Sequence, residues 1–245
     1  MAAPTENNSP DAPSNRLRQS WDANADAWCD AVREGRIESR RKATDEAVLR
    51  AVLRGAPTRV LDVGCGEGWL CRALARRGTE AVGVDGSVPL IKAARERGGG
   101  TFHACSYAEI ADDPDRLGRG YDVVVCNFAL LDKTLRPLLE ALHVLCAPTG
   151  RLIVQTVHPW AACEDRPYTD GWRTEDFRGF GEAFDEPMPW YFRTLASWVD
   201  TLHGANWLLE ALREPSHPDT GDPLSLLLTC RKRSSQGQCA RFGRG

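Results

Sequence analysis

The sequence of 245 residues lacks the features that mark membrane and secreted proteins. No run approaches the roughly 20 consecutive apolar residues needed to cross a bilayer. Residues 1–15 have no basic start followed by an apolar stretch, so they are not a secretory signal and are expected to form a polar, disordered tail. We therefore expect a cytoplasmic protein with no membrane span.

Cysteine and histidine patterns typical of metal sites are also missing. The nine cysteines include no CxxC pair and no CxxxCxxC cluster, which argues against an iron-sulfur centre. Cys126 and Cys230 lie inside apolar runs, where a free thiol behaves as a small hydrophobic side chain. Four histidines show no ligand spacing with carboxylates, namely His103, His143, His203 and His217. We predict no metal.

Positive charge is concentrated at the C-terminus. The net charge is −3, yet residues 231–245 alone contribute +5, so the rest of the chain carries −8. Such an acidic body repels a phosphate backbone, and we expect no nucleic-acid partner. The basic end, residues 234–245, could touch RNA or membrane, although a flexible solvated tail is the simpler interpretation.

Strand-like and helix-like segments alternate along the middle of the chain. Before them, residues 16–53 show helical spacing of apolar side chains, as at Trp21, Ala25 and Trp28. The expected strands cover residues 58–64, 80–85, 101–105, 121–128 and 151–157, and the expected helices cover 69–78, 88–100 and 134–150. Apolar strands without polar alternation are typical of a parallel sheet covered by helices on both faces. A helix at 191–202 and strands at 206–215 and 223–231 complete a single domain over residues 16–233.

A glycine-rich loop follows the first expected strand. Gly64, Gly66 and Gly68 end the strand and precede a helix, which is where a doubly wound α/β sheet binds nucleotides. A dinucleotide fingerprint is GxGxxG, but here the spacing is GxGxG and Trp69 occupies the place of the third glycine. The spacing therefore weakens the prediction of a dinucleotide.

Two acids near this loop favour a cofactor without phosphate. Asp62, two residues before the loop, would repel a pyrophosphate but attract the ammonium and sulfonium groups of S-adenosylmethionine (SAM). Asp85 ends the next strand, 23 residues after Asp62, close to the spacing at which a carboxylate binds ribose hydroxyls. The structural alternative is that Asp62 caps the glycine loop and that Asp85 caps the helix after Gly86.

The motifs VLDVGCGEG, VGVD and YDVVVCNFALL resemble those of the class I SAM-dependent methyltransferases. The similarity covers about residues 58–155 and is greatest to the type 11 and type 12 domains, the group that contains the ubiquinone and menaquinone methylases. It implies a Rossmann-like, seven-stranded sheet of order 3-2-1-4-5-7-6 with an antiparallel last strand and N-terminal helices.

The resemblance also assigns cofactor contacts by position. Gly64, Cys65 and Gly66 would line the methionine part, Asp85 the ribose, and Asn127 with Phe128 the reactive side. Ser106 and Tyr107 stand where this family often places an acid for the adenine, so a hydroxyl and ring stacking would replace it. Trp21 and Asn24 resemble an element that folds over SAM, although Trp21 could equally be core, and Arg40 could pair with the methionine carboxylate. The whole expected cofactor set is Trp21, Arg40, Asp62, Gly64, Cys65, Gly66, Gly68, Asp85, Gly86, Ser106, Tyr107, Asn127 and Phe128.

An aromatic segment follows the fifth strand. Residues 160–192 hold nine of the 19 aromatic side chains, and eight acids against three arginines. An insertion at the carboxyl edge of the sheet lies over the ligand crevice, so we interpret residues 158–193 as a substrate lid. The alternative is a small satellite core under a loop. The expected substrate contacts are Trp160, Tyr168, Trp172, Arg173, Trp190, Tyr191 and Arg193.

His158, directly after the fifth strand, is the candidate general base, because a neutral imidazole accepts a proton near pH 7. A structural histidine that holds the turn before Pro159 is the alternative. The hypothesis is an enzyme, monomeric or homodimeric, that transfers the SAM methyl group to an oxygen or nitrogen of a small, aromatic or amphipathic metabolite. An RNA or protein methyltransferase, a SAM-binding subunit without catalysis and a nicotinamide oxidoreductase remain as alternatives.

Overall fold

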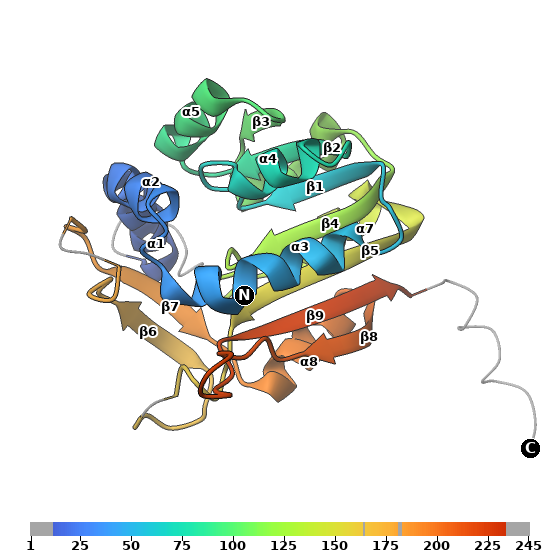
Figure 1. Ribbon diagram of the computed structural model, residues 1–245. Coiled ribbons are helices and arrows are strands. Elements are labelled where there is room, and N and C mark those ends of the chain that lie inside the picture. Colours follow the sequence, from blue (N-terminus) through green and yellow to red (C-terminus); the bar gives the residue numbers. More distant parts are fainter. Residues whose placement is uncertain (1–11, 164, 181–182, 234–245) are drawn as a thin grey trace, which may run out of the picture.

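The alternating segments form a sheet between two layers of helices (Figure 1). The computed structural model describes residues 12–163, 165–180 and 183–233. The strands of the main sheet are β1 (Arg59–Val63), β2 (Glu80–Asp85), β3 (Thr101–Ala104), β4 (Tyr121–Asn127), β5 (Cys146–Val157), β8 (Trp207–Arg213) and β9 (Ser225–Lys232). The helices between them are α4 (Trp69–Ala75), α5 (Val88–Arg97), α6 (Tyr107–Asp112), the 3-10 helix η3 (Pro114–Leu117), α7 (Arg136–Leu145) and α8 (Leu195–Gly204).

The strand order of the main sheet is β3-β2-β1-β4-β5-β9-β8. β1 pairs in parallel with β2 on one side and with β4 on the other, whereas β9 is antiparallel to both of its neighbours. Numbered within this sheet alone, the order is 3-2-1-4-5-7-6 with an antiparallel last strand. The fold expected from the sequence is confirmed.

Side chains alternate between the two helix layers, as the period of two in a strand requires. In β4, Val123 and Val125 face the core with α3 (Asp45–Leu53), α4 and α5, and Val124 faces the core with α7 and α8. All three valines are fully buried. The same alternation in β1 turns Asp62 to the α4 side, and this places a carboxyl group inside an apolar layer.

Four helical segments precede β1. They are α1 (Pro13–Ala23), α2 (Ala25–Arg33), the π-helical turn η2 (Arg40–Thr44) and α3. α1 begins inside the segment expected to be a tail, and residues 1–11 of that tail lie outside the described residues, as do residues 234–245. Figure 1 shows α1 and α2 beside the end of the sheet to which β1 and β4 point.

The expected lid contains a two-stranded antiparallel hairpin, β6 (Gly171–Glu175) and β7 (Met188–Phe192). The expected helix at 191–202 is therefore wrong at its start, because residues 191 and 192 pair with β6 and Thr194 caps α8 instead. The expected helix at 134–150 is also too long. α7 ends at Leu145, and the residues after it belong to β5.

Asn24, at the junction of α1 and α2, joins these helices to the lid. Its Oδ1 accepts hydrogen bonds from the backbone N–H groups of Asp185 and Glu186, at 3.0 and 3.3 Å, and its amide donates to the Glu186 carbonyl at 2.6 Å. The Asn24 residue is 1 % exposed. One side chain thus satisfies three backbone groups of a segment more than 160 residues away in the sequence.

We predict that Asn24→Ala lowers the free energy of unfolding by about 2 kcal/mol, because it leaves the N–H groups of Asp185 and Glu186 without their acceptor, while the Glu186 carbonyl keeps the Ser20 hydroxyl as a donor. Urea denaturation measures the change. Gln19→Ala, at an exposed position of α1, is the matched control and should leave stability within about 0.5 kcal/mol. Equal stability of the two variants would contradict the role of Asn24 in holding the lid.

Candidate functional site

The candidate site lies where β1, β2 and β4 end. Parallel pairing brings the carboxyl ends of these three strands to one edge of the sheet, which faces α1, α2 and the β6-β7 hairpin (Figure 1). β1 is the strand at which the order of the sheet reverses, and ligands of doubly wound sheets bind at such a point.

The glycine loop requires residues without a side chain. Gly64 has φ +73°, and a Cβ on it would collide with Ala129 in the loop after β4. Gly68 has φ +80°, and its Cβ would lie 2.7 Å from the Phe102 ring. Only glycine fits at these two positions. The loop therefore passes tightly between β3 and the segment that follows β4.

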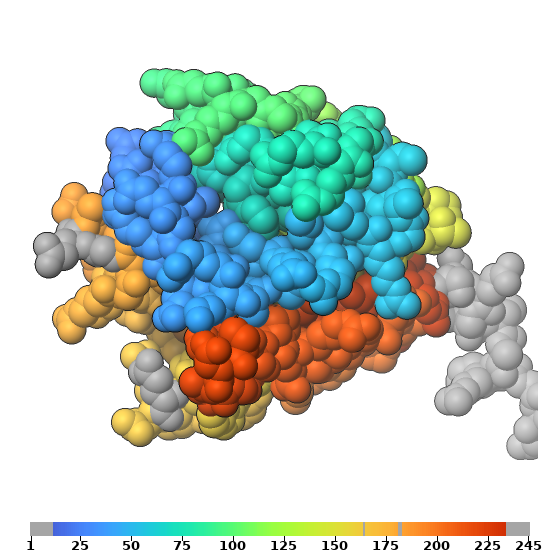
Figure 2. Space-filling view, in the orientation of Figure 1, coloured from blue at the N-terminus to red at the C-terminus, as the bar shows by residue number. Residues whose placement is uncertain are grey.

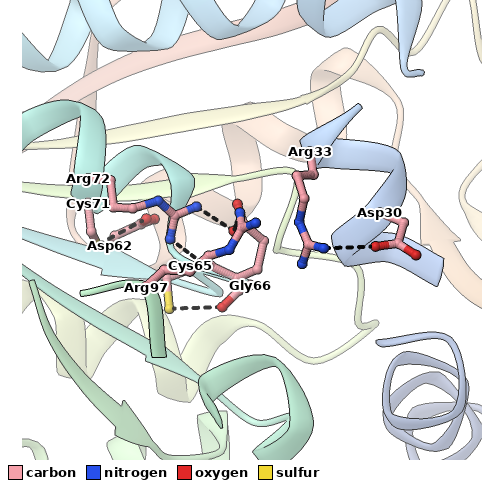
Figure 3. A network of polar contacts seen from close by, with 9 residues as sticks. Asp30, Arg33, Asp62, Cys65, Gly66, Cys71, Arg72 and Arg97 are labelled. Atoms are coloured by element: carbon pink, nitrogen blue, oxygen red, sulfur yellow. Dashed lines mark hydrogen bonds and ion pairs between the residues drawn. The ribbon is translucent and has the colours of Figure 1, made fainter. Parts of the chain in front are cut away.

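Asp62 lies behind the glycine loop and is 2 % exposed. Its Oδ2 accepts a hydrogen bond from the Cys71 thiol, with 3.6 Å between sulfur and oxygen, as Figure 3 shows. Its Oδ1 is buried and has no partner among the residues that the structure describes. Burial, with a smaller contribution from the nearby Asp85 carboxylate, raises the pKa of Asp62 to about 7, although the Cys71 hydrogen bond opposes the rise. A buried acceptor is thus available for a ligand donor or a water molecule.

Asp85 uses both carboxyl oxygens to hold the backbone around the site. Oδ2 accepts from the N–H of Gly66 at 2.9 Å, and Oδ1 accepts from the N–H of Ser87 at 2.8 Å. Burial raises the pKa of Asp85, and these two hydrogen bonds oppose the rise. Each carboxylate oxygen accepts more than one bond, so Asp85 can still bind hydroxyl groups. Asp85 is not the N-cap of α5, because that position is Ser87, and the two backbone bonds of Asp85 are compatible with the expected ribose role.

A polar network that the sequence analysis missed supports the end of β4. The Gln155 amide donates to Asn127 Oδ1 at 2.9 Å and to the Thr44 carbonyl at 3.0 Å. Gln155 Oε1 and Thr44 Oγ1 are buried without a partner among the described residues. Phe128 has φ +52°, a conformation that costs energy for a residue with a side chain and clusters at functional sites. Gln155 was detectable in the sequence as the polar residue inside the apolar run RLIVQTV.

Ser106 and Tyr107 have structural contacts that the sequence did not predict. Ser106 is the N-cap of α6 and forms a capping box with Glu109. The Tyr107 hydroxyl donates to the Ala129 carbonyl at 2.9 Å and lies beside Gly64. The Tyr107 hydroxyl therefore lies between the glycine loop and the loop after β4.

The N-terminal helices cover the glycine loop through Trp28 more directly than through Trp21. The indole nitrogen of Trp28 lies 3.6 Å from the position of a Cβ on Gly66. Trp21 packs edge-on against Trp28, at 5.0 Å between centroids, and against Phe177 of the lid, at 6.2 Å. Arg40 bonds Asp45 at 2.8 Å and stacks over the Trp69 ring at 4.7 Å. It lies on the outer side of the glycine loop.

The aromatic side chains of the lid form an apolar cluster with α1 and Leu131. Phe177 stacks on Phe184 with 4.6 Å between centroids and is 2 % exposed. The other members are Leu17, Trp21, Phe180, Met188 and Trp190. Trp172 and Tyr191 are cross-strand neighbours at 5.5 Å. The segment that carries β6 and β7 is thus attached to the N-terminal helices by packing, as the satellite-core alternative supposed, and it also packs on Leu131 in the loop that follows β4.

The other expected substrate residues lie farther from this cluster. Trp160 and Tyr168 are 63 % and 48 % exposed. Arg173 donates to the carbonyls of Ala162 and Pro167 and stacks on Phe192. Arg193 is 4 % exposed and donates to the carbonyls of residues 132 and 133, each at 2.6 Å. Arg173 fixes the backbone before β6, and Arg193 joins the end of the hairpin to the loop after β4.

His158 uses both ring nitrogens. Nδ1 accepts a hydrogen bond from the Trp160 N–H at 3.2 Å, so the proton is on Nε2, which donates to Glu214 at 2.8 Å. His158 is 8 % exposed. This geometry favours the structural alternative, a histidine that holds the turn after β5, over a general base.

Within the described residues, no group of three or more His, Cys, Asp or Glu side chains could hold a metal ion. The eight cysteines in this part of the chain are free and buried. None of the helices described here is both long enough and apolar enough to cross a membrane.

Comparisons with known proteins agree with this geometry. Residues 36–209 match the model of a family described as methyltransferase domain. The chain is 36 % identical over 113 residues to a ubiquinone biosynthesis O-methyltransferase of Xylella fastidiosa, an alignment that covers 44 % of this chain and 45 % of the relative. The chain therefore spans about half the length of the curated relatives it matches.

Solved structures extend the similarity over nearly the whole chain. A 1,6-didemethyltoxoflavin-N1-methyltransferase of Burkholderia thailandensis, with S-adenosylhomocysteine bound, has a TM-score of 0.65 at 21 % identity, covering 96 % of this chain and 94 % of that one. A magnesium protoporphyrin IX methyltransferase of Synechocystis, with SAM bound, has a TM-score of 0.59 at 18 % identity and covers 96 % of this chain and 100 % of that one. At this identity the likeness shows the shared fold.

The raised pKa of Asp62 predicts a pH-dependent stability. Because the folded protein holds this proton more tightly than the unfolded chain, the contribution of Asp62 to the free energy of unfolding falls as the pH rises from about 4 to about 7. Asp62→Asn lacks this contribution. Its stability relative to the wild type should therefore increase with pH, by at most about 1.4 kcal/mol per pH unit.

Urea denaturation without cofactor, from about pH 5 to about pH 8, measures this difference. Asp112→Asn, at an exposed position of α6, is the matched control. A difference between Asp62→Asn and wild type that stays constant with pH would show that Asp62 does not titrate in this range.

Proposed function

The chain belongs to the family of SAM-dependent methyltransferases, and we propose that it transfers the methyl group of SAM to an oxygen or nitrogen atom of a small aromatic or amphipathic metabolite. The observation that carries the proposal is the buried Asp62 carboxyl, with an unpartnered oxygen directly behind a glycine loop whose far side is held by Asp85.

The residues at this edge fit SAM better than a dinucleotide. The Asp62 carboxyl would lie next to any phosphate bound on the loop. Burial already disfavours the negative charge of Asp62, and a neighbouring phosphate would disfavour it further. A ligand that carries an ammonium group would instead stabilise that charge. Asp85 has acceptor capacity left for ribose hydroxyls, and the amide nitrogen of Asn127 is not used by the Gln155 network.

SAM, when bound, supplies a methyl group on a positively charged sulfur. In the proposed reaction, the glycine loop, Asp62 and Asp85 hold the cofactor in place. The cluster of Phe177, Trp190 and Leu131 excludes water from the acceptor side and offers apolar walls, which is what an in-line methyl transfer needs.

The acceptor class rests on the aromatic lid and on the proteins that resemble this chain. Ubiquinone biosynthesis, toxoflavin and magnesium protoporphyrin methyltransferases are named for small acceptors with ring systems. An aromatic cluster that closes over the sheet edge supports an acceptor of the same kind. The proposed partner is therefore a small molecule.

Cofactor binding tests the proposal. SAM should raise the melting temperature and bind in isothermal titration calorimetry, whereas NADH should do neither. Asp85→Asn should weaken SAM binding at least tenfold, because a neutral amide replaces an acceptor of charge-assisted bonds; this is an order-of-magnitude figure. Glu96→Gln, on the exposed side of α5, is the matched control. A shift with NADH and none with SAM would overturn the assignment.

We further propose that His158 positions the turn after β5 and is not the general base. His158→Asn should keep kcat within about threefold and leave its pH profile unchanged, since loss of a true base costs roughly a hundredfold or more. The readout is release of S-adenosylhomocysteine with an acceptor selected from a panel of phenols, catechols and amines. A large loss of kcat with unchanged SAM affinity would establish His158 as the base.

A further inference from the structure

A groove of about 290 Å³ lies on the outer side of the glycine loop, between α2, η2 and α4. Figure 2 shows the surface hollowed between the N-terminal helices and α4. Five of its lining side chains carry guanidinium groups, namely Arg33, Arg40, Arg72, Arg76 and Arg97. Two carboxylates, Asp45 and Glu67, face them, so the lining has an excess of three positive charges in a chain of net charge −3.

Glu67 provides an unusual acceptor in this basic groove. The residue is 1 % exposed, and its Oε2 pairs with Arg72 and, at 3.4 Å, with Arg97. Its Oε1 is buried and has no hydrogen-bond partner among the described residues. A buried carboxylate oxygen without a donor costs free energy, and a ligand with an O–H group next to its charge would remove that cost.

Two guanidinium groups are available to a ligand. Arg76 is exposed and forms no side-chain hydrogen bond or ion pair within the described part of the chain. Arg33 pairs with Asp30 at 3.1 Å, but both side chains are about half exposed, so the pair contributes little stability. Figure 3 shows Arg33, Arg72 and Arg97 gathered beside Cys65 and Gly66 of the loop.

We propose that this groove binds the phosphate group of a small ligand. Guanidinium forks match the oxygen geometry of phosphate, and several of them together favour an anion with more than one charge. Near neutral pH, inorganic phosphate still carries an O–H group, and a sugar phosphate carries hydroxyl groups on its sugar. Either hydroxyl can donate to Glu67 Oε1, which has no donor among the described residues. Sulfate has a similar shape and charge but no O–H group.

The groove is separate from the proposed cofactor pocket. Its lining includes none of Asp62, Gly64, Asp85 or Asn127, and only Arg40 was expected to contact the cofactor. Phosphate should therefore bind with and without SAM. Because Glu67 follows Gly66 directly, the groove and the cofactor loop share a backbone segment, and occupancy of one site would restrain the other.

Isothermal titration calorimetry of the full chain tests the proposal with inorganic phosphate, sulfate and glucose 6-phosphate, each in the absence of SAM and at saturating SAM. Phosphate or the sugar phosphate should bind at least tenfold more tightly than sulfate at equal ionic strength, an order-of-magnitude figure for one hydrogen bond to a charged group. Tighter binding of the sugar phosphate would identify a phosphorylated metabolite, and equal binding would identify the free ion.

Variants locate the site. Arg76→Ala should weaken phosphate binding about tenfold without changing SAM affinity. Arg77→Ala is the matched control, because Arg77 is the next residue, carries the same charge and points to the Ala73 carbonyl instead of the groove. Glu67→Gln should abolish the preference for phosphate over sulfate, since its amide can donate to either anion.

Three outcomes would overturn the proposal: no phosphate binding, equal binding of phosphate and sulfate to the wild type, or equal loss in Arg76→Ala and Arg77→Ala. If Glu67→Gln fails to fold, as judged by circular dichroism, the comparison of the two arginine variants still decides. Phosphate binding is measured without SAM as well, so failure of the proposed function leaves this test intact.

Discussion

The pairing of β1 between β2 and β4 determines where the main proposed cofactor contacts, Asp62, Asp85 and Asn127, lie. In register, Asp62 is opposite Gly83 on one side and Val125 on the other, so Asp62, Asp85 and Asn127 come from three neighbouring strands that end at one edge. The apolar faces of the same strands fix which side each residue takes. Because β1 is buried on both faces, the Asp62 carboxyl cannot turn to solvent, and its altered acidity is a consequence of strand pairing.

Local patterns were sufficient to predict the sheet and the glycine loop. Buried parallel strands are continuous apolar runs, which are visible in the sequence. Gly64 and Gly68 occur where the backbone has a positive φ and where a side chain would collide with Ala129 or Phe102. The acids near the ends of β1 and β2 were visible for the same reason, since Asp62 is the penultimate residue of β1 and Asp85 is the last residue of β2. These features depend on neighbours in the sequence, and their positions agree with the expected ones.

Features that depend on distant partners were not predictable. The strand Met188–Phe192 is determined by pairing with β6, and Tyr191 and Phe192 were therefore assigned to a helix. Tyr107 reaches Ala129, and His158 reaches Glu214. In each case a side chain chosen for its chemistry forms a contact that the sequence did not indicate. Gln155 is the opposite case, because the sequence did give a signal. It is a polar residue inside an apolar run, and its amide joins β5 to Thr44 and Asn127.

The hydrogen bonds of Asn24 limit how the molecule can open. They tie the backbone at residues 185 and 186 to the junction of α1 and α2, while Trp21 packs on both Trp28 and Phe177. The hairpin therefore cannot swing away as an independent flap without breaking these contacts. If the hairpin moves with these contacts intact, α1 and α2 must move with it. Trp28 would then move away from Gly66 together with the aromatic cluster. In the proposed enzyme, entry of an acceptor and uncovering of the glycine loop would then be coupled through these contacts.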